Sequence, residues 1–238
     1  AGALVPEADR PREVLAATHE KDEVIVLYRK DYAPYEVIDR AALADLSHRG
    51  ISFVALRGAI AGPSATWAKE TFGAGWTADS RRFRALMMLN VRTDAHPLAK
   101  DASTFDVTDQ TVFELDLHEK IQVLASSFTS KVSANRKKIA EVADKASVYD
   151  IQPQAWVFEN SRLRSAVFLQ GEAETLAHAS YRTFIKRGIA WAARRANVDE
   201  LCSKQDLADM RYPVGGPSRA EKAIAAFQMQ PGFKAGVV

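Results

Sequence analysis

The 238-residue chain has one cysteine, so no disulfide can form within it. It also has no strong excess of charge, because 32 basic residues against 30 acidic ones give a net charge of +2. A dedicated nucleic-acid-binding protein usually shows a pronounced basic footprint, so nucleic acid is not an expected partner. No apolar run approaches the ~18 residues of a membrane-spanning helix, and no signal-peptide core is found at the start. These absences indicate a globular chain, whose 47% hydrophobic residues are ordinary for that class.

Two residues of reactive type stand alone in the sequence. Cys202 lies in the segment NVDELCSKQD at the end of a predicted helix. No neighbouring base or motif accompanies it, so we expect an inert thiol. His96 precedes Pro97 without a second histidine nearby, which favours capping of a turn over metal binding. We therefore predict no metal site and no cofactor.

The clearest structural signal is a strand–helix–strand pattern near the start. Residues 23–28 (EVIVLY) and 51–56 (ISFVAL) are nearly continuous apolar runs rich in β-branched residues. Such runs are typical of parallel strands covered by helices on both faces. Apolar residues at helical spacing predict a helix over 35–46, and Gly50 follows as its C-terminal cap. Together they make one βαβ unit, preceded by a short helix over 11–18.

The middle of the chain alternates strands with less regular segments. Strands are predicted over 84–92 and 121–126, and a polar helix over 133–146. The alternating segment 105–117 suggests an irregular crossing over the sheet edge. QAWVFE and RSAVFLQG flank the tetrapeptide NSRL, which predicts an antiparallel hairpin over 154–171.

The last predicted helix of the domain, residues 180–195, has one apolar face. Its basic residues are expected to form a solvated face: Arg182, Lys186, Arg187, Arg194 and Arg195. After Lys204, proline and glycine recur every few residues, with a short helix predicted near 220–227. We therefore divide the chain into an α/β domain, residues 1–203, and an extended tail or linker, residues 204–238.

Several collinear stretches resemble the trehalose-utilisation ThuA-like family, whose fold is that of class I glutamine amidotransferases. The most specific is the segment 153–195, with a P-x-A-W strand and a closing helix of the form G-I-x-W-A. DVTDQTVFELDL, DAHPLAKD and GISFVALRGAI resemble further family segments in the same order. The resemblance implies a flavodoxin-like three-layer sandwich with a mainly parallel sheet and a C-terminal antiparallel hairpin. Part of the first βα unit is expected to be missing, because only AGALV remains for the opening strand.

The sequence departs from the family pattern at three polar positions that would face one cleft. Arg57 stands where the family commonly has histidine, and Gln110 follows Thr108-Asp109 where the family has glutamate. The segment 171–174 reads Gly-Glu-Ala-Glu where the family has G-L-G-H. Amidotransferases place a cysteine at the turn that Arg57 occupies. Since neither that thiol nor a histidine in the matching loop is present, glutamine hydrolysis is excluded.

The sequence leaves two functions open for this cleft. In the first, the domain has lost its ancestral chemistry and is a non-catalytic scaffold or interaction module. In the second, it is a carbohydrate-active enzyme or sugar-binding domain, placed where open α/β sheets bind ligands. Its acid/base candidates are Glu172, Glu174 and Asp109, and its substrate-binding candidates are Arg57, Gln110, Trp67 and Trp76. The carboxylates could instead hold a divalent cation, or an Arg57–glutamate pair could be purely structural.

The tail, from Met210 onward, resembles the entry into a sugar-dehydrogenase-like β-propeller of large secreted proteins. That resemblance implies a secreted or periplasmic location. It also implies other protein subunits, or a downstream β-propeller domain, as partners, with a sugar as a possible ligand.

Overall fold

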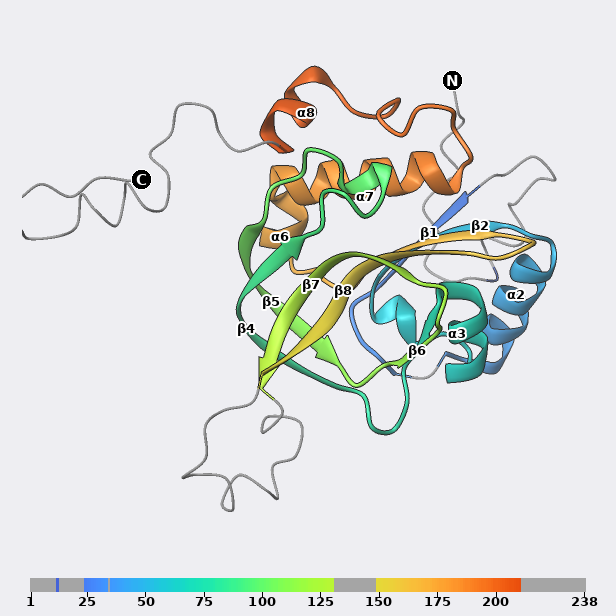
Figure 1. Cartoon of the computed structure of the whole chain (residues 1–238). Coiled ribbons are helices and arrows are strands. Elements are labelled where there is room, and N and C mark those ends of the chain that lie inside the picture. The colour runs from blue at the N-terminus through green and yellow to red at the C-terminus, as the bar shows by residue number, and fades with distance from the viewer. Residues whose placement is uncertain (1–11, 13–23, 34, 131–148, 211–238) are drawn as a thin grey trace, which may run out of the picture.

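The computed structural model describes residues 12, 24–33, 35–130 and 149–210 (Figure 1). The predicted helices over 11–18, 133–146 and 220–227, the opening strand and the linker after residue 210 fall outside these residues. Seven strands form one sheet in the order β1-β2-β9-β8-β7-β4-β5. In that order they are Val24–Arg29, Ser52–Arg57, Arg164–Phe168, Tyr149–Glu159, Gln122–Ser130, Arg81–Val91 and Phe105–Phe113.

The sheet is mixed. Strands β1, β2 and β9 pair in parallel, which confirms the predicted βαβ unit. Strands β8, β7, β4 and β5 continue the sheet through antiparallel pairings, starting from the predicted β8–β9 hairpin. The prediction of a mainly parallel sheet was therefore wrong for this half. The reason is that long apolar runs report burial of both faces of a strand but not its direction.

Strand β5 also differs from the prediction. The sequence suggested an irregular crossing over 105–117, but residues 105–113 pair with β4 along the whole strand, from Phe105 opposite Leu89 to Phe113 opposite Arg81. The alternation in this segment is that of a regular strand. Residues 116–117 form the separate strand β6 (Asp116–Leu117), paired with β3 (Ala74–Gly75).

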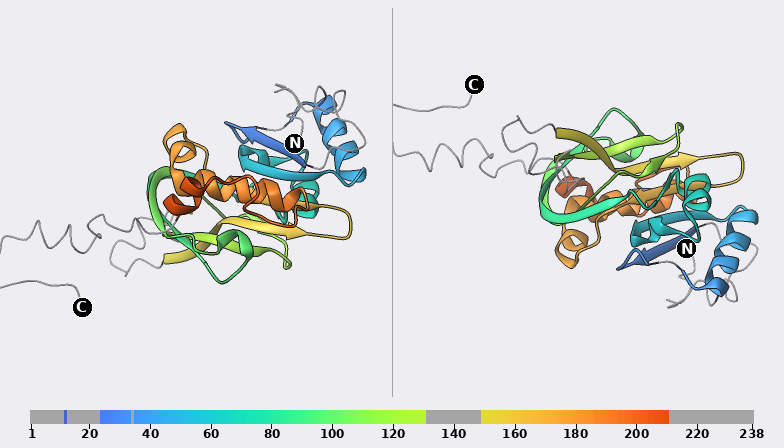
Figure 2. Two further views of the ribbon diagram at one scale, coloured as in Figure 1. Left: turned by 90° about the horizontal axis from the view of Figure 1, so that it is seen from above. Right: turned by 90° about the horizontal axis from the view of Figure 1, so that it is seen from below.

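Helices cover both faces of the sheet (Figure 2). One core cluster joins the sheet to α2 (Val37–His48) and α3 (Ala65–Phe72), and the other joins it to α7 (Ala179–Ala192). Along β2, Phe53 belongs to the first core and Val54 to the second, and both are fully buried. The predicted C-terminal cap of α2 is confirmed, since Gly50 has φ 78°.

Beyond the boundary predicted at residue 204, the described chain forms the helix α8 (Lys204–Met210). Met210 is buried in the α7 core, and Asp206 binds Lys186 of α7 at 2.7 Å. The Lys186 ammonium and the backbone N–H of Ser203 hold the pKa of the Asp206 carboxyl at about 2. Residues 204–210 therefore form a helix that packs against α7.

The basic face predicted for α7 is not uniformly solvated. Arg182 is exposed, but the Arg187 side chain is buried. Its guanidinium donates to the carbonyl oxygens of Leu98 and Lys100 and to the Asp199 carboxylate at 2.6 Å. Arg187 thus binds two segments, residues 98–100 and Asp199, to α7. Helical spacing in the sequence does not predict this role.

Candidate functional site

The candidate site lies where β2 ends. Arg57, its last residue, has φ 54° and ψ −121°, and the chain turns directly into a 3₁₀ helix, η1 (Gly58–Ala61). A positive φ is uncommon and costly for a residue with a side chain, and such strain concentrates at functional positions. Gly58 is required for packing, since a Cβ there would collide with the carbonyl oxygen of Asp31. The strand-end turn expected from the sequence is therefore present.

The Arg57 side chain is directed into the protein and its charge is paired. One terminal nitrogen, Nη2, donates to Glu172 Oε1 at 2.7 Å, and Nη1 donates to the Gly171 carbonyl oxygen at 3.2 Å. Burial by itself lowers the pKa of the Arg57 guanidinium, but Glu172, Tyr28 and Asp109 raise it overall. The pairing of Arg57 with a glutamate, one of the alternatives left open by the sequence, is thus present in the structure.

Asp109, on β5, is fully buried and faces the same turn. Its Oδ2 accepts the backbone N–H groups of Gly171 and Glu172 at 3.0 and 2.9 Å, and its Oδ1 accepts the N–H of Gln110. Glu172 is the N-cap of α6 (Ala173–Ala177) but makes no capping bond with its own side chain. Asp109 therefore fixes the backbone at the start of α6 from a neighbouring strand.

Two buried glutamines, which the sequence did not single out, connect the strand ends. Gln154 on β8 exchanges hydrogen bonds with the backbone N–H and C=O of Val112 on β5. The Gln170 side-chain amide donates to Gln154 Oε1 and to the Gln110 backbone carbonyl oxygen. The backbone carbonyl oxygen of Gln170 accepts the hydroxyl of Tyr181. This network joins β5, β8 and α7 to the segment that follows β9, beside the candidate residues.

Tyr32 forms a second group next to the cleft, together with Trp76 and Arg82. The Tyr32 and Trp76 rings lie 4.4 Å apart, and the Arg82 guanidinium lies 4.8 Å from the Tyr32 ring. Burial raises the pKa of the Tyr32 hydroxyl beyond the usual tyrosine range, although Arg82 and Arg57 oppose this. Arg82 also donates to the Gln110 side chain at 3.0 Å. Gln110 and Trp76 are thus occupied by protein contacts.

The remaining predicted residues lie apart from this cluster. Glu174 is on the exposed side of α6. Trp67, on α3, packs edge-on against Phe53 and Phe72, and its indole N–H donates to Ser47 on α2. Arg57, Asp109, Glu172 and Gln110 are therefore brought together, Trp76 flanks them, and Trp67 belongs to the packing of α2 and α3.

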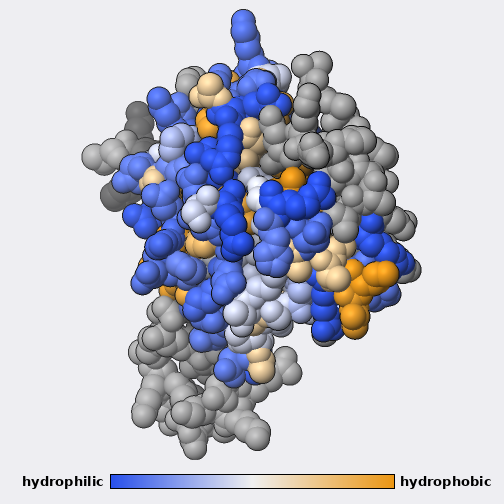
Figure 3. Space-filling view, turned by 90° about the vertical axis from the view of Figure 1, so that its right-hand side faces the viewer, coloured by the Kyte–Doolittle hydropathy of each residue, from blue (hydrophilic) through white to orange (hydrophobic). Residues whose placement is uncertain are grey.

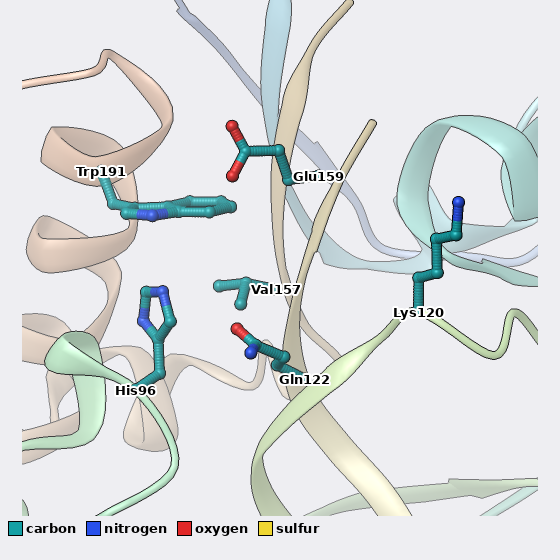
Figure 4. Close-up of a pocket in the computed structure, with 6 residues that line it drawn as sticks. All are labelled: His96, Lys120, Gln122, Val157, Glu159 and Trp191. Carbon is teal, nitrogen blue, oxygen red and sulfur yellow. The ribbon is translucent and has the colours of Figure 1, made fainter. Parts of the chain in front are cut away.

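A separate hollow of about 230 Å³ lies against α7 (Figure 4). Its lining residues are His96, Lys120, Gln122, Val157, Glu159 and Trp191. His96 caps the following turn by accepting the N–H of Leu98, as predicted. Burial and the nearby Arg164 lower its pKa, although Glu159 opposes this. Arg57, Asp109 and Glu172 do not line this hollow, so it is distinct from the candidate site at the end of β2.

Among the described residues, no group of three or more metal-ligating side chains is found, and no helix there is long and apolar enough to cross a membrane. Cys202 is half-buried, and burial raises the pKa of its thiol, which opposes reactivity. General acid/base chemistry requires a carboxylate that can reach a substrate. Asp109 is fully buried and accepts three backbone N–H groups, and the Glu172 carboxylate is paired with Arg57.

The fold is that of an α/β domain with a mixed sheet, and a turn follows the carboxyl end of its parallel strand β2. Residues 10–192 match the family model described as ThuA, trehalose utilisation. The chain therefore belongs to the ThuA family.

Solved structures agree on the fold. The chain is similar to a putative ThuA-like protein from Parabacteroides merdae ATCC 43184, with a TM-score of 0.51 and 15% identity over 72% of this chain and 70% of that one. A putative ThuA-like protein from Bacteroides uniformis ATCC 8492 gives a TM-score of 0.50 and 15% identity over 71% and 69%. The comparison with curated proteins found no match.

Proposed function

We propose that this chain is a ThuA-family domain whose strand-end cleft has become internal structure. In this proposal it is a non-catalytic scaffold or interaction module within a larger secreted or periplasmic assembly. The observation that carries the proposal is Asp109, a fully buried carboxylate whose two oxygens accept three backbone N–H groups. A carboxylate bound in this way stabilises the fold and has no access to a substrate.

The Arg57–Glu172 pair supports the same proposal. The pair holds α6 against the end of β2, and a charge-assisted hydrogen bond of 2.7 Å is among the stronger interactions available. Other parts of the proposal are supported by the sequence resemblance. They are a flavodoxin-like three-layer arrangement and a tail that follows the α/β domain. The proposed partners, other subunits or a downstream β-propeller, have the same support.

A carbohydrate-active enzyme or sugar-binding domain is the second candidate. It is favoured by the exposure of Glu174 and by the partial exposure of the Glu172 side chain, 28%, at the mouth of the cleft. The family description, trehalose utilisation, also points to sugars. In this alternative Arg57 orients the sugar, and Glu172 or Glu174 carries out the acid/base step.

Thermal unfolding in the presence of simple sugars, 3-keto sugars and divalent cations separates the two functions. A ligand at a hundredfold excess over its dissociation constant stabilises the folded state by about 2.7 kcal/mol. We expect no shift in melting temperature for any of these compounds, and no sugar turnover. Glu174→Gln should also leave the melting temperature unchanged, because this side chain is exposed.

The sugar-binding alternative predicts a different pattern. A shift that disappears in Arg57→Ala or Glu174→Gln, with both variants folded by circular dichroism, would contradict the scaffold proposal. Loss of turnover in Glu174→Gln with normal folding would establish an enzyme.

A further inference from the structure

Arg57 is bound by the protein incompletely. The guanidinium has five N–H donors and pairs best with a carboxylate through two parallel hydrogen bonds. Here Nη2 binds only one oxygen of Glu172, and Nε is buried without a hydrogen-bond partner among the described residues. On the edge of the guanidinium formed by Nε and Nη2, only Nη2 therefore donates a hydrogen bond.

The Glu172 side chain lies between this edge of the guanidinium and solvent. The Arg57 side chain is 6% exposed, whereas the Glu172 side chain that covers it is 28% exposed. Glu172 lies at the N-cap of α6, and its backbone N–H is held by Asp109 independently of the side chain. The Asp109 hydrogen bond to the start of α6 therefore does not depend on the contact between the Glu172 side chain and Arg57.

Nearby polar groups are also unsatisfied. Tyr32, which interacts electrostatically with Arg57, is 9% exposed, and its hydroxyl has no hydrogen-bond partner among the described residues. Gln170, which precedes Gly171, is fully buried, and its side-chain oxygen also has no hydrogen-bond partner among the described residues. Burying a polar atom without a partner costs about 1–3 kcal/mol, so each of these groups would be stabilised by a polar ligand atom within hydrogen-bonding distance.

We propose that Glu172 is an internal ligand that blocks a carboxylate-binding site on Arg57, and that a small carboxylate molecule displaces it. The incoming carboxylate pairs with both Nε and Nη2, which Glu172 does not achieve. Arg57 lies at the strained turn, where φ is 54°, and this conformation aims the guanidinium at the start of α6. No chemical step is involved, so the site goes beyond the scaffold role and does not depend on it.

The test measures binding of acetate, glycolate and gluconate to the whole chain by NMR, following the Arg57 Nε–H signal at constant ionic strength. The signal is assigned by its loss in Arg57→Lys. We expect Glu172→Ala to bind at least one of these carboxylates at least tenfold more tightly than the unmodified chain. Glu174→Ala is the matched control, since it removes the same charge from the exposed side of the same helix, and its affinity should stay that of the unmodified chain.

The proposal would be overturned if the Glu172→Ala and Glu174→Ala chains bound the carboxylates with equal affinity. It would also be overturned if the Glu172→Ala chain still bound them after Arg57→Gln. A response to chloride as large as the response to the carboxylates would overturn it as well, because it would indicate a general anion effect. If Glu172→Ala does not fold, Glu172→Gln replaces it, because the amide keeps the size of the side chain and removes its charge. The same tenfold gain is then expected, and its absence is decisive.

Discussion

Replacing Asp109 by asparagine is expected to lower the free energy of unfolding by about 2–4 kcal/mol. The carboxylate accepts backbone N–H groups on both oxygens, from Gly171 and Glu172 on one side and Gln110 on the other. An asparagine side chain must turn its NH₂ group toward one of these donors. At least one buried N–H group then loses its acceptor, and a donor–donor contact is created.

Urea denaturation at pH 7, with the midpoint and slope both fitted, measures this effect. Asp94→Asn is the control, because Asp94 is exposed and a surface substitution usually changes stability by less than about 0.5 kcal/mol. Residues kept for activity often destabilise the fold, so their replacement is neutral or stabilising. An Asp109→Asn chain that is as stable as the original, or more stable, would argue for a catalytic carboxylate.

The second large effect is expected at Arg187. Its substitution by methionine should destabilise the domain by about 2–4 kcal/mol, because buried carbonyl oxygens lose a charged donor and the partly exposed Asp199 loses its partner. The change leaves Asp199 without its 2.6 Å partner and leaves the Leu98 and Lys100 carbonyl oxygens without a donor. Methionine keeps most of the length of the side chain, so the loss reports the hydrogen bonds rather than a cavity.

Arg182→Met on the same helix provides the comparison, since Arg182 is exposed. We expect less than about 0.5 kcal/mol for that change. Guanidinium chloride unfolding of the two variants side by side distinguishes them. Equal small effects would mean that Arg187 is solvated in solution, as the basic pattern of α7 first suggested.

Much of the fold could be predicted from the sequence, because apolar spacing reports burial directly. The runs EVIVLY and ISFVAL became β1 and β2, and the β8–β9 hairpin followed from its flanking strands. Strand direction could not be predicted this way. The antiparallel half of the sheet arises from long-range pairings such as β4 with β7, whose partners are set by the whole core rather than by local pattern.

The candidate site was predicted in part. Arg57, Asp109 and Glu172 meet as the strand-end argument required, but that argument could not tell whether their charges would face a substrate or one another. The burial of Gln154 and Gln170 could not be predicted from the sequence. A glutamine beside an apolar run is expected at the surface unless its hydrogen-bond partners are known. The same holds for Tyr32, whose neighbours Trp76 and Arg82 are distant in sequence.

The central claim is that Arg57 and Glu172 bind each other and close the cleft. A double-mutant cycle with Arg57→Met and Glu172→Gln, read by urea denaturation, measures their interaction free energy directly. We predict a coupling of about 1.5–3 kcal/mol, as expected for a hydrogen bond between charged groups. The same cycle with Glu174→Gln should give a coupling near zero. A coupling below about 0.5 kcal/mol for Arg57 and Glu172, within the error of additivity, would contradict the claim and leave both charges available for a ligand.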